Sequence, residues 1–302
     1  TGGSAMVKAA YSSGNPALGV GPGNGPSFIE RSADIPAAVK HIMDSKTFDN
    51  GTICASEQSI VTESCIADKV KEEVKRQGGY FLNEEQSKKL EKMIMRANNT
   101  MNPAIVGKSV QTIARMAGIT VPEGTRVLVS EQTEVGPKHP YSREKLCPIL
   151  AFFVEPDWEK ACEKSIQILQ NEGAGHTMTI HSQNEAVIRE FALKKPVSRL
   201  LVNTPGALGG VGATTGLAPA LTLGCGAVGG SATSDNISPL NLFNIRRVAW
   251  GLCGLDDLRA QAGMAQQPAG CASGSCAAGA GLNSSDVERI TREILAAVLK
   301  KN

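Results

Sequence analysis

Short apolar segments alternate with helical segments along most of this chain, and this alternation limits its fold more than any other feature. Five runs rich in Val, Ile, Leu and Phe predict buried strands, over residues 59–64, 126–132, 149–156, 177–182 and 199–205. Segments with apolar residues at helical spacing stand between or beside them, over residues 32–45, 66–78, 83–97, 109–119, 157–173 and 185–195. Strands that alternate with helices are typical of α/β layers, so the sequence predicts a mostly parallel sheet covered by helices.

The two ends of the chain follow a different pattern. Residues 1–14 are expected to form a glycine turn and then a helix, and residues 15–30 a short buried strand that runs into a Gly- and Pro-rich loop. Residues 253–283 consist largely of Gly, Ala, Ser and Gln, which predicts a flexible linker. An amphipathic helix is predicted over residues 284–302, because apolar residues recur on one face: Val287, Ile290, Ile294, Leu295 and Val298.

Composition argues against several classes of function. The 302 residues suffice for one large or two ordinary domains, and 41% of them are hydrophobic. A net charge of +2 and an aromatic content of 4% do not suit a nucleic-acid-binding surface. The chain has no run of 18 apolar residues, so no membrane-spanning helix is expected. Its eight scattered cysteines are expected to be reduced, as in the cytoplasm.

The glycines near the start of the chain match no nucleotide-binding motif. Their spacing misses the dinucleotide fingerprint, because Asn24 or Pro26 stands where the third glycine is needed, and no phosphate-loop Lys-Ser or Lys-Thr pair follows. Thr1, Gly2, Gly3 and Ser4 precede the first expected helix, where free backbone N–H groups attract phosphate. A tight turn without a ligand explains the same four residues. Both interpretations remain open.

No group of side chains has the spacing of a metal site. His176 and His181 are five residues apart in or beside an expected strand, and an odd spacing directs them to opposite faces. Cys271 and Cys276 lie in the expected linker without two further ligands. A single histidine beside a glycine turn, as at His176, is more often structural than catalytic. We therefore expect no metal.

Cys54 has two interpretations. A cysteine is usually a small buried hydrophobic residue. However, Asn50 and Gly51 favour a turn, and residues 52–58 are expected to form a turn that runs into a helix. The N-terminus of a helix stabilises a thiolate and lowers the pKa of a cysteine. Cys54 is thus either a nucleophile or a packed core residue.

Several segments, taken together, resemble the coenzyme A-acylating branch of the aldehyde dehydrogenase superfamily, including acetaldehyde and propionaldehyde dehydrogenases of bacterial microcompartments. They occur in the family's order from Thr1 to about Gly251, and include FDNGTICASEQSIV, REKLCPILAFF, GAGHTMTIHS and LTLGCGAVGG. The resemblance implies an α/β fold with a Rossmann-type cofactor domain, partial here, and an α/β catalytic domain with a mostly parallel sheet. The implied reaction oxidises a short-chain aldehyde, acetaldehyde or propionaldehyde, with NAD and coenzyme A to acyl-coenzyme A.

The resemblance also implies roles for individual residues. Cys54 matches the catalytic cysteine, which attacks the aldehyde and carries the acyl group as a thioester. His176 either helps to deprotonate the incoming thiol or only braces its loop. The implied cofactor-binding residues are the turn Thr1, Gly2, Gly3 and Ser4, the loop residues Val20 and Gly21, and Glu144 and Pro148. Glu144 matches the glutamate that binds the nicotinamide ribose, although a surface charge is its simpler interpretation.

One departure from the family concerns hydrolysis. Hydrolytic members carry a glutamate in the glycine loop, where it activates water to cleave the thioester. Val20 or Gly21 stands at that place, and neither accepts a proton. A thiol such as coenzyme A is then needed to release the acyl group. A hydrolytic aldehyde dehydrogenase remains the nearest alternative.

The resemblance suggests how the chain is organised. Residues 1–35 are expected to be the C-terminal part of the NAD-binding domain, 36–225 the catalytic domain, and 226–252 a return segment with oligomer contacts. The family's upstream segment, which completes the nucleotide sheet and supplies an Asn to the oxyanion hole, is expected to be missing. The backbone N–H of Cys54 would then be the remaining oxyanion donor.

The tail suggests partners and a location. The helix over 284–302 resembles the encapsulation peptides that direct enzymes into bacterial microcompartments, which implies shell proteins as partners and the lumen of a compartment in the bacterial cytoplasm. Packing on the protein's own body, or at an oligomer interface, explains the same apolar stripe. A homo-oligomer, either a dimer or a tetramer, is expected. A non-catalytic microcompartment assembly protein is the alternative from another class.

Overall fold

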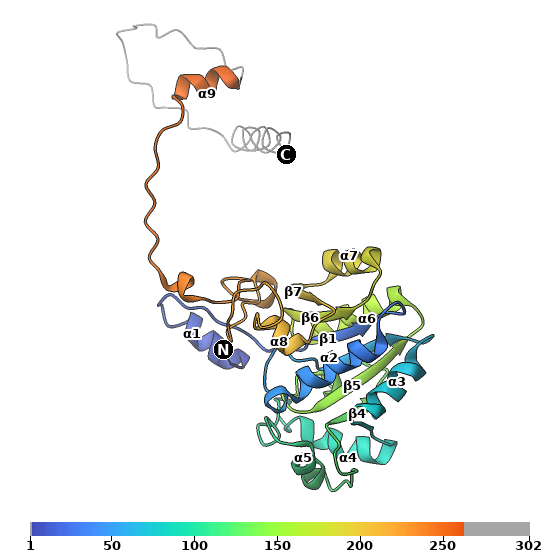
Figure 1. Cartoon of the computed structure of the whole chain (residues 1–302). Coiled ribbons are helices and arrows are strands. Elements are labelled where there is room, and N and C mark those ends of the chain that lie inside the picture. The colour runs from blue at the N-terminus through green and yellow to red at the C-terminus, as the bar shows by residue number, and fades with distance from the viewer. Residues whose placement is uncertain (1, 263–302) are drawn as a thin grey trace, which may run out of the picture. The chain divides into compact units, whose positions relative to one another are not determined.

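A seven-stranded parallel sheet forms the centre of the computed structural model, which describes residues 2–262 (Figure 1). The strands are β1 Pro26–Ile29, β2 Ser59–Glu63, β3 Gly79–Phe81, β4 Val127–Glu131, β5 Ile149–Glu155, β6 Gly175–His181 and β7 Val197–Val202. They lie in the order β3-β4-β5-β2-β1-β6-β7, and each neighbouring pair is parallel. The predicted α/β fold with a mostly parallel sheet is confirmed.

The helices are α1 Ser4–Tyr11, α2 Ile35–Thr47, α3 Ala67–Arg76, α4 Glu84–Ile94, α5 Val110–Ala117, α6 Trp158–Asn171, α7 Glu185–Lys194, α8 Gly206–Gly210 and α9 Leu255–Gln261. Six of them, α2 to α7, lie within or close to the predicted ranges, whereas α8 and α9 were not predicted. The side chain of Asp157 accepts a hydrogen bond from Lys160 N and begins α6. Gly118, with φ of 63°, ends α5 in the left-handed conformation.

Helices cover both faces of the sheet because successive strand residues point to opposite sides. On one face, Ile29 and Ile60 pack with α2 and α3. On the other, the neighbouring residues Phe28 and Val61 pack with α4, α5, α6 and α7. Both layers contain fully buried side chains. The strands are therefore apolar on both faces and stand at the centre of the molecule.

The strand order determines where loops from distant parts of the sequence meet. In a parallel sheet, every segment that enters a strand does so at the same edge. β5, β2, β1 and β6 are consecutive in the sheet. The segments that precede them, residues 144–148, 52–58, 21–25 and 173–174, therefore lie side by side at the amino edge.

The segment before β1 differs from the prediction. Residues 15–30 were expected to place the strand before the glycine loop, but the loop comes first and the strand begins at Pro26. Side chains bind the backbone at Gly19, where a strand was expected. Tyr11 Oη accepts a hydrogen bond from Gly19 N, and Ser231 Oγ donates one to Gly19 O. No neighbouring strand pairs there, so residues 16–20 are extended without belonging to the sheet.

The structure divides the chain into two compact units, residues 1–244 and 245–302. β1 falls in the range expected for the cofactor-binding part, yet it pairs with β2 and β6 and belongs to the sheet of the first unit. In the second unit, α9 lies within the expected linker 253–283, which is therefore partly helical. Asp257 accepts a hydrogen bond from Gly254 N, and Asp256 pairs with Arg259, so polar side chains stabilise this short helix. The helix predicted over 284–302 lies outside the described residues.

No helix within residues 2–262 has the length and apolar character needed to cross a membrane. This agrees with the apolar runs of the sequence, which are strand-sized.

Phe191 of α7 provides a test of the core. Its ring is fully buried and stacks on that of Phe28, with ring centroids 4.8 Å apart. Phe191→Ala is expected to lower the free energy of unfolding by about 3–5 kcal/mol, because it removes buried apolar surface and leaves a cavity. Leu193→Ala, on the same helix but 69% exposed, is the control and should cost little. Denaturant unfolding of both variants measures the difference, and equal costs would contradict the assigned packing.

Candidate active site

Cys54 lies in an irregular turn between α2 and β2. Before it, Asp49, Asn50 and Gly51 have φ of 47°, 50° and 76°, so three successive residues are left-handed. After it the chain passes directly into β2, and no helix begins at residues 52–58. The predicted helix at Cys54 is therefore wrong. The residues after Cys54 are taken into the sheet, where Gln58 N donates to Gly25 O and Ala151 N donates to Gln58 O.

The thiol of Cys54 is consequently less acidic than the sequence suggested. Burial raises its pKa to about 12, and the negative charge of Glu144 adds to the increase. The backbone N–H of Cys54 and the positive charge of Arg199 act in the opposite direction. Without a helix N-terminus, the surroundings of the thiol favour its protonated form in this state.

The glycines before β1 allow close approach of the backbone. A Cβ atom at Gly23 would lie 2.0 Å from the carbonyl oxygen of Cys54, and one at Gly25 would lie 2.6 Å from that of Thr177. Neither distance is possible between real atoms, so any side chain there would displace the Cys54 turn or β6. These glycines therefore bring β1 against the loops on both sides of it.

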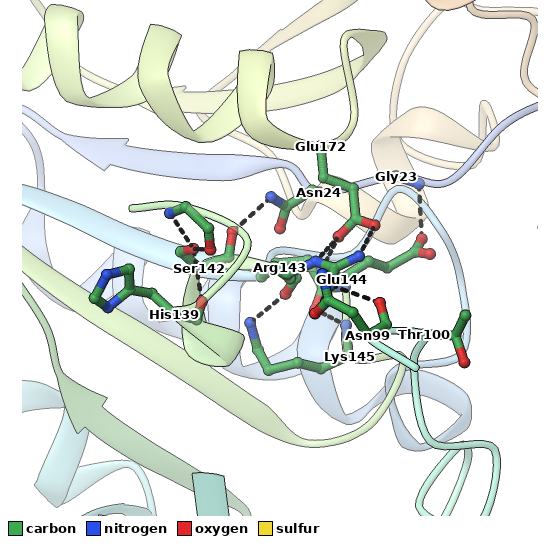
Figure 2. A network of polar contacts seen from close by, with 12 residues as sticks. Gly23, Asn24, Asn99, Thr100, His139, Ser142, Arg143, Glu144, Lys145 and Glu172 are labelled. Atoms are coloured by element: carbon green, nitrogen blue, oxygen red, sulfur yellow. Dashed lines mark hydrogen bonds and ion pairs between the residues drawn. The ribbon is translucent and has the colours of Figure 1, made fainter. Parts of the chain in front are cut away.

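Glu144 lies at the same edge of the sheet as Cys54. It is 7% exposed, and its Oε1 accepts a hydrogen bond of 2.7 Å from Gly23 N (Figure 2). Burial raises the pKa of Glu144 to about 8, although the Gly23 N–H opposes the increase. The interpretation of Glu144 as a surface charge does not agree with this burial. The structure places Cys54, Gly23 and Glu144 together.

An ion pair holds the backbone around Glu144. Glu172 pairs with Arg143 at 3.0 Å and also accepts a hydrogen bond of 2.8 Å from Glu144 N (Figure 2). Asn24 donates from Nδ2 to the carbonyl oxygen of Ser142 at 2.8 Å. The sequence analysis missed Glu172, Arg143 and Asn24, because their partners are distant in the chain. Together they connect the entries to β1, β5 and β6.

Two lysines lie buried beneath this edge. Lys46 donates to Gln58 Oε1 at 3.1 Å, and Lys145 donates to the carbonyl oxygens of Tyr141 and Arg143, each at 2.7 Å. Burial lowers the pKa of Lys46 to about 8 and that of Lys145 well below its usual value. Both positive charges act to lower the pKa of Glu144. No pattern in the sequence marks these lysines.

His176 and His181 lie at opposite ends of β6. His181 is next to the ring of His41, with centroids 5.6 Å apart. His176 is fully buried, and its Nδ1 bonds with Thr177 Oγ1 at 3.0 Å, whereas its Nε2 has no partner. Burial, and then the charge of Arg199, lowers the pKa of His176 to about 3, so its ring is neutral. No hydrogen bond connects it to Cys54.

The other expected binding residues are distributed over two places. Gly3 is the N-cap of α1 without a side-chain cap, Thr1 lies outside the described residues, and Ser4 is the first residue of α1. Gly21 lines a cavity of about 400 Å³ together with Lys8 and Tyr11 of α1. Val20 and Pro148 are buried, and the carbonyl oxygen of Pro148 accepts a sheet hydrogen bond from Leu128 N.

No group of three potential metal ligands is present among residues 2–262.

Comparisons with known proteins agree with this geometry. The chain is 69% identical to a probable aldehyde dehydrogenase from Listeria monocytogenes, with a TM-score of 0.83 over 85% of this chain and 57% of that one. An acetylating aldehyde dehydrogenase from Geobacillus thermoglucosidasius is 51% identical, with a TM-score of 0.82 over 84% and 56%. The chain belongs to the aldehyde dehydrogenase family, among its acylating members.

More distant relatives show how much of a complete enzyme the chain represents. Aldehyde-alcohol dehydrogenase 2 of Entamoeba histolytica is 44% identical over 258 residues, which are 82% of this chain and 30% of that protein. A propionaldehyde dehydrogenase from Rhodopseudomonas palustris is 27% identical, and its structure contains coenzyme A and an acylated cysteine. No protein-family model matches. This aldehyde dehydrogenase chain thus spans between about a third and just over half of the length of these relatives.

Glu144 provides a pH-dependent test of the site. Glu144→Gln is expected to accelerate alkylation of Cys54 by up to about tenfold above pH 8, because it removes the negative charge that raises the thiol pKa. Below pH 8 Glu144 is mostly protonated, so Gln should change the rate little. A pH profile of alkylation by iodoacetamide, with mass spectrometry to locate the label, measures the rate both above and below pH 8. Glu85→Gln on exposed α4 is the control, and an unchanged profile above pH 8 would contradict the proximity of Glu144 to Cys54.

Proposed function

We propose that Cys54 is the nucleophile of an acylating aldehyde dehydrogenase that converts an aldehyde, NAD and coenzyme A to acyl-coenzyme A and NADH. The observation that carries the proposal is the position of its thiol, where the entry loops of four adjacent strands meet beside the buried carboxyl of Glu144. The acylated cysteine and coenzyme A in the Rhodopseudomonas structure support it.

The proposed reaction uses the thiol twice. The thiolate sulfur of Cys54 forms a bond to the aldehyde carbon, and the carbonyl oxygen takes the negative charge near the backbone N–H of Cys54. Loss of a hydride from that carbon leaves a thioester on Cys54, and NAD supplies the acceptor for this hydride when bound. The thiolate of coenzyme A then attacks the thioester carbon, and Cys54 leaves as a thiolate. The hydride thus leaves with its electron pair to NAD, and the acyl group leaves to coenzyme A.

The residues at the amino edge fit the cofactor. The uncapped N-terminus of α1, at Gly3 and Ser4, offers free backbone N–H groups for a pyrophosphate, and Gly2 precedes them. A cavity lined by Gly21 and by Lys8 and Tyr11 lies along the second half of the same helix. Glu144 would hold the nicotinamide ribose, with its carboxyl already positioned by Gly23 N. Hydrogen bonds from the ribose to Glu144 would weaken the effect of the Glu144 charge, which raises the pKa of Cys54.

Release of the acyl group to a thiol follows from the lack of a base in the glycine loop. Val20 is 1% exposed and apolar, and Gly21 has no side chain, so neither can activate water. Glu144 is the carboxyl whose charge acts on Cys54, and its Oε1 already accepts a hydrogen bond from Gly23 N. We therefore propose slow hydrolysis and rapid transfer to coenzyme A. Acetaldehyde and propionaldehyde are the proposed substrates, since acetylating and propionaldehyde dehydrogenases are among its structural neighbours.

Turnover of the full-length enzyme tests the proposal. With acetaldehyde or propionaldehyde and NAD, sustained NADH formation is expected only when coenzyme A is present, and a single burst without it. Cys54→Ala should lower turnover more than about 10³-fold, because it removes the proposed nucleophile. Cys65→Ala is the matched control, since Cys65 is exposed. Near-normal activity of Cys54→Ala would refute the nucleophile, and equal steady rates without coenzyme A would favour the hydrolytic alternative.

We also propose that the enzyme is a homo-oligomer, either a dimer or a tetramer, enclosed in a bacterial microcompartment in the cytoplasm. Residues 240–258 expose large apolar side chains that suit a contact with another copy, including Trp250 at 79% and Leu252 at 97% exposure. A structural neighbour, 30% identical, is a propionaldehyde dehydrogenase from the fucose utilisation microcompartment of Clostridium phytofermentans. The proposed shell-binding segment is residues 284–302, outside the described residues.

A fusion experiment tests the compartment. A fluorescent reporter that carries residues 284–302 is expected to co-sediment with purified shells, because the apolar stripe of that segment needs a partner surface. Replacement of Ile290, Ile294 and Leu295 with Glu should abolish co-sedimentation. The same reporter with residues 185–195, a helical segment of the body, is the control. A reporter that remains in the supernatant, while the enzyme without 284–302 still sediments, would refute the targeting role.

A further inference from the structure

A buried cysteine and a buried lysine are in contact at a place that the proposed reaction does not use. Cys162 lies on α6, and Lys195 directly follows the last residue of α7 (Figure 1). Lys195 Nζ donates a hydrogen bond to Cys162 Sγ. The two residues are 33 positions apart in the sequence, so only the fold brings them together.

The ammonium of Lys195 has no carboxylate partner within residues 2–262. The neighbouring Lys194 is exposed and pairs with Glu190, whereas none of the ion pairs found in this range includes Lys195. Lys195 is only 6% exposed, and Cys162 is 5% exposed. Lys195 Nζ lies 3.9 Å from the centroid of the Phe191 ring, whose face attracts a cation. The sulfur and the aromatic ring thus take the place of a counter-charge.

The surrounding structure fixes the position of Lys195. The Phe191 ring beneath its ammonium is itself held by stacking on Phe28. The backbone N–H of Lys195 donates to Phe191 O, and its carbonyl oxygen accepts from Val197 N. Pro196 comes next and favours the extended backbone that Lys195 adopts, with φ of −83° and ψ of 133°. The nitrogen is therefore held against the sulfur by contacts on several sides.

A lysine in contact with a cysteine changes the chemistry of both groups. Thiolates, and not thiols, attack peroxides, and an adjacent ammonium stabilises a thiolate. Burial lowers the pKa of Lys195, although its hydrogen bond to Cys162 opposes the decrease. The same nitrogen can thus act first as a cation beside the sulfur and then, after it loses a proton, as a nucleophile.

We infer that Cys162 and Lys195 form a site of reversible oxidation, at which hydrogen peroxide joins the two side chains through a sulfenamide bond. The thiolate sulfur of Cys162 attacks one peroxide oxygen, the O–O bond breaks, and the departing hydroxide takes a proton from the Lys195 ammonium. The neutral nitrogen then attacks the sulfur of the sulfenic acid, the S–O bond breaks, and this hydroxide takes a proton from the nitrogen. The sulfur is oxidised, the peroxide is reduced, and both of its oxygen atoms leave as water.

This oxidation does not depend on the proposed role of Cys54. Burial raises the pKa of the Cys54 thiol to about 12, so Cys54 is expected to react slowly with peroxide. The cross-link would join α6, which ends next to Glu172 of the candidate site, to the segment that enters β7. A small thiol would attack the sulfur and release the Lys195 amine, which makes the modification reversible.

Peptide mapping of the full-length enzyme after treatment with hydrogen peroxide tests the site. The expected product is a cross-linked pair of peptides, one with Cys162 and one with Lys195, that together lack two hydrogen atoms. Dithiothreitol should separate them, and Cys147, which is fully buried, should stay unmodified. A Cys162 that stays reduced overturns the inference, and so does a Cys162 that is oxidised to sulfinic acid without any cross-link.

Substitutions of Lys195 separate the effect of its charge from that of its nitrogen. Lys195→Met should slow oxidation of Cys162 about tenfold, measured as loss of its free thiol, and abolish the cross-link. Lys195→Arg keeps the charge, so the rate should stay within about threefold of the parent, but a guanidinium stays protonated and should form no cross-link. Lys194→Met is the matched control and should change neither result. Equal rates in the parent and Lys195→Met overturn the inference. If Lys195→Met does not fold, as judged by circular dichroism, Lys195→Arg and the peptide map of the parent still decide.

The Cys54→Ala variant distinguishes failure of this inference from failure of the proposed function. It should form the cross-link between Cys162 and Lys195 at the rate of the parent, whatever its effect on turnover. A cross-link that requires Cys54 overturns the inference, because the oxidation would then begin at the other thiol.

Discussion

The position of β1 between β2 and β6 is the constraint on which the rest of this structure depends. β1 has only four residues, all of them buried, yet it pairs with both neighbours in parallel. Gly23 and Gly25 before it let the backbone contact the Cys54 turn on one side and Thr177 on the other. Because all strands are parallel, their entry loops meet at one edge. The candidate site is therefore a direct result of strand order, and it uses residues from five segments of the chain.

Buried charges at this edge are balanced against each other. Lys46 and Lys145 lie beneath Glu57 and Glu144, and burial favours the neutral form of each. The pKa of Lys46 falls to about 8, that of Glu57 rises to about 7 and that of Glu144 to about 8, so the values of acids and bases approach each other. Perturbed groups of this kind are concentrated at functional sites.

The sequence predicted those features that depend on neighbours in the chain. Asp157 and Gly118 define helix ends through local hydrogen bonds and local backbone conformation, and they lie at the ends of the helices predicted over residues 157–173 and 109–119. The short strand β3, Gly79–Phe81, was missed because three residues carry too little periodicity. The helix expected after Cys54 was wrong, because the sheet takes up residues 59–63 and the tertiary contact with Gly23 fixes the turn.

The candidate site was predicted only in part for the same reason. Cys54 and Glu144 were identified through a resemblance, and the structure places them at one edge of the sheet. Asn24 and Arg199 act through partners that are 118 and 22 residues away in the chain, respectively, and no local pattern marks either one. Their contacts depend on burial and on partners brought together by the sheet, which are properties of the folded state. A sequence read without its fold does not contain this information.

The burial of Cys54 has a consequence for the lifetime of the enzyme. Hydrogen peroxide and other oxidants attack thiolates, and a thiol that is protonated at neutral pH reacts slowly with them. The folded protein keeps the Cys54 thiol in its protonated form through burial and the charge of Glu144. An unfolded chain would expose the same cysteine with its ordinary acidity. The same surroundings that oppose deprotonation of Cys54, its partial burial and the charge of Glu144, therefore also disfavour its oxidation.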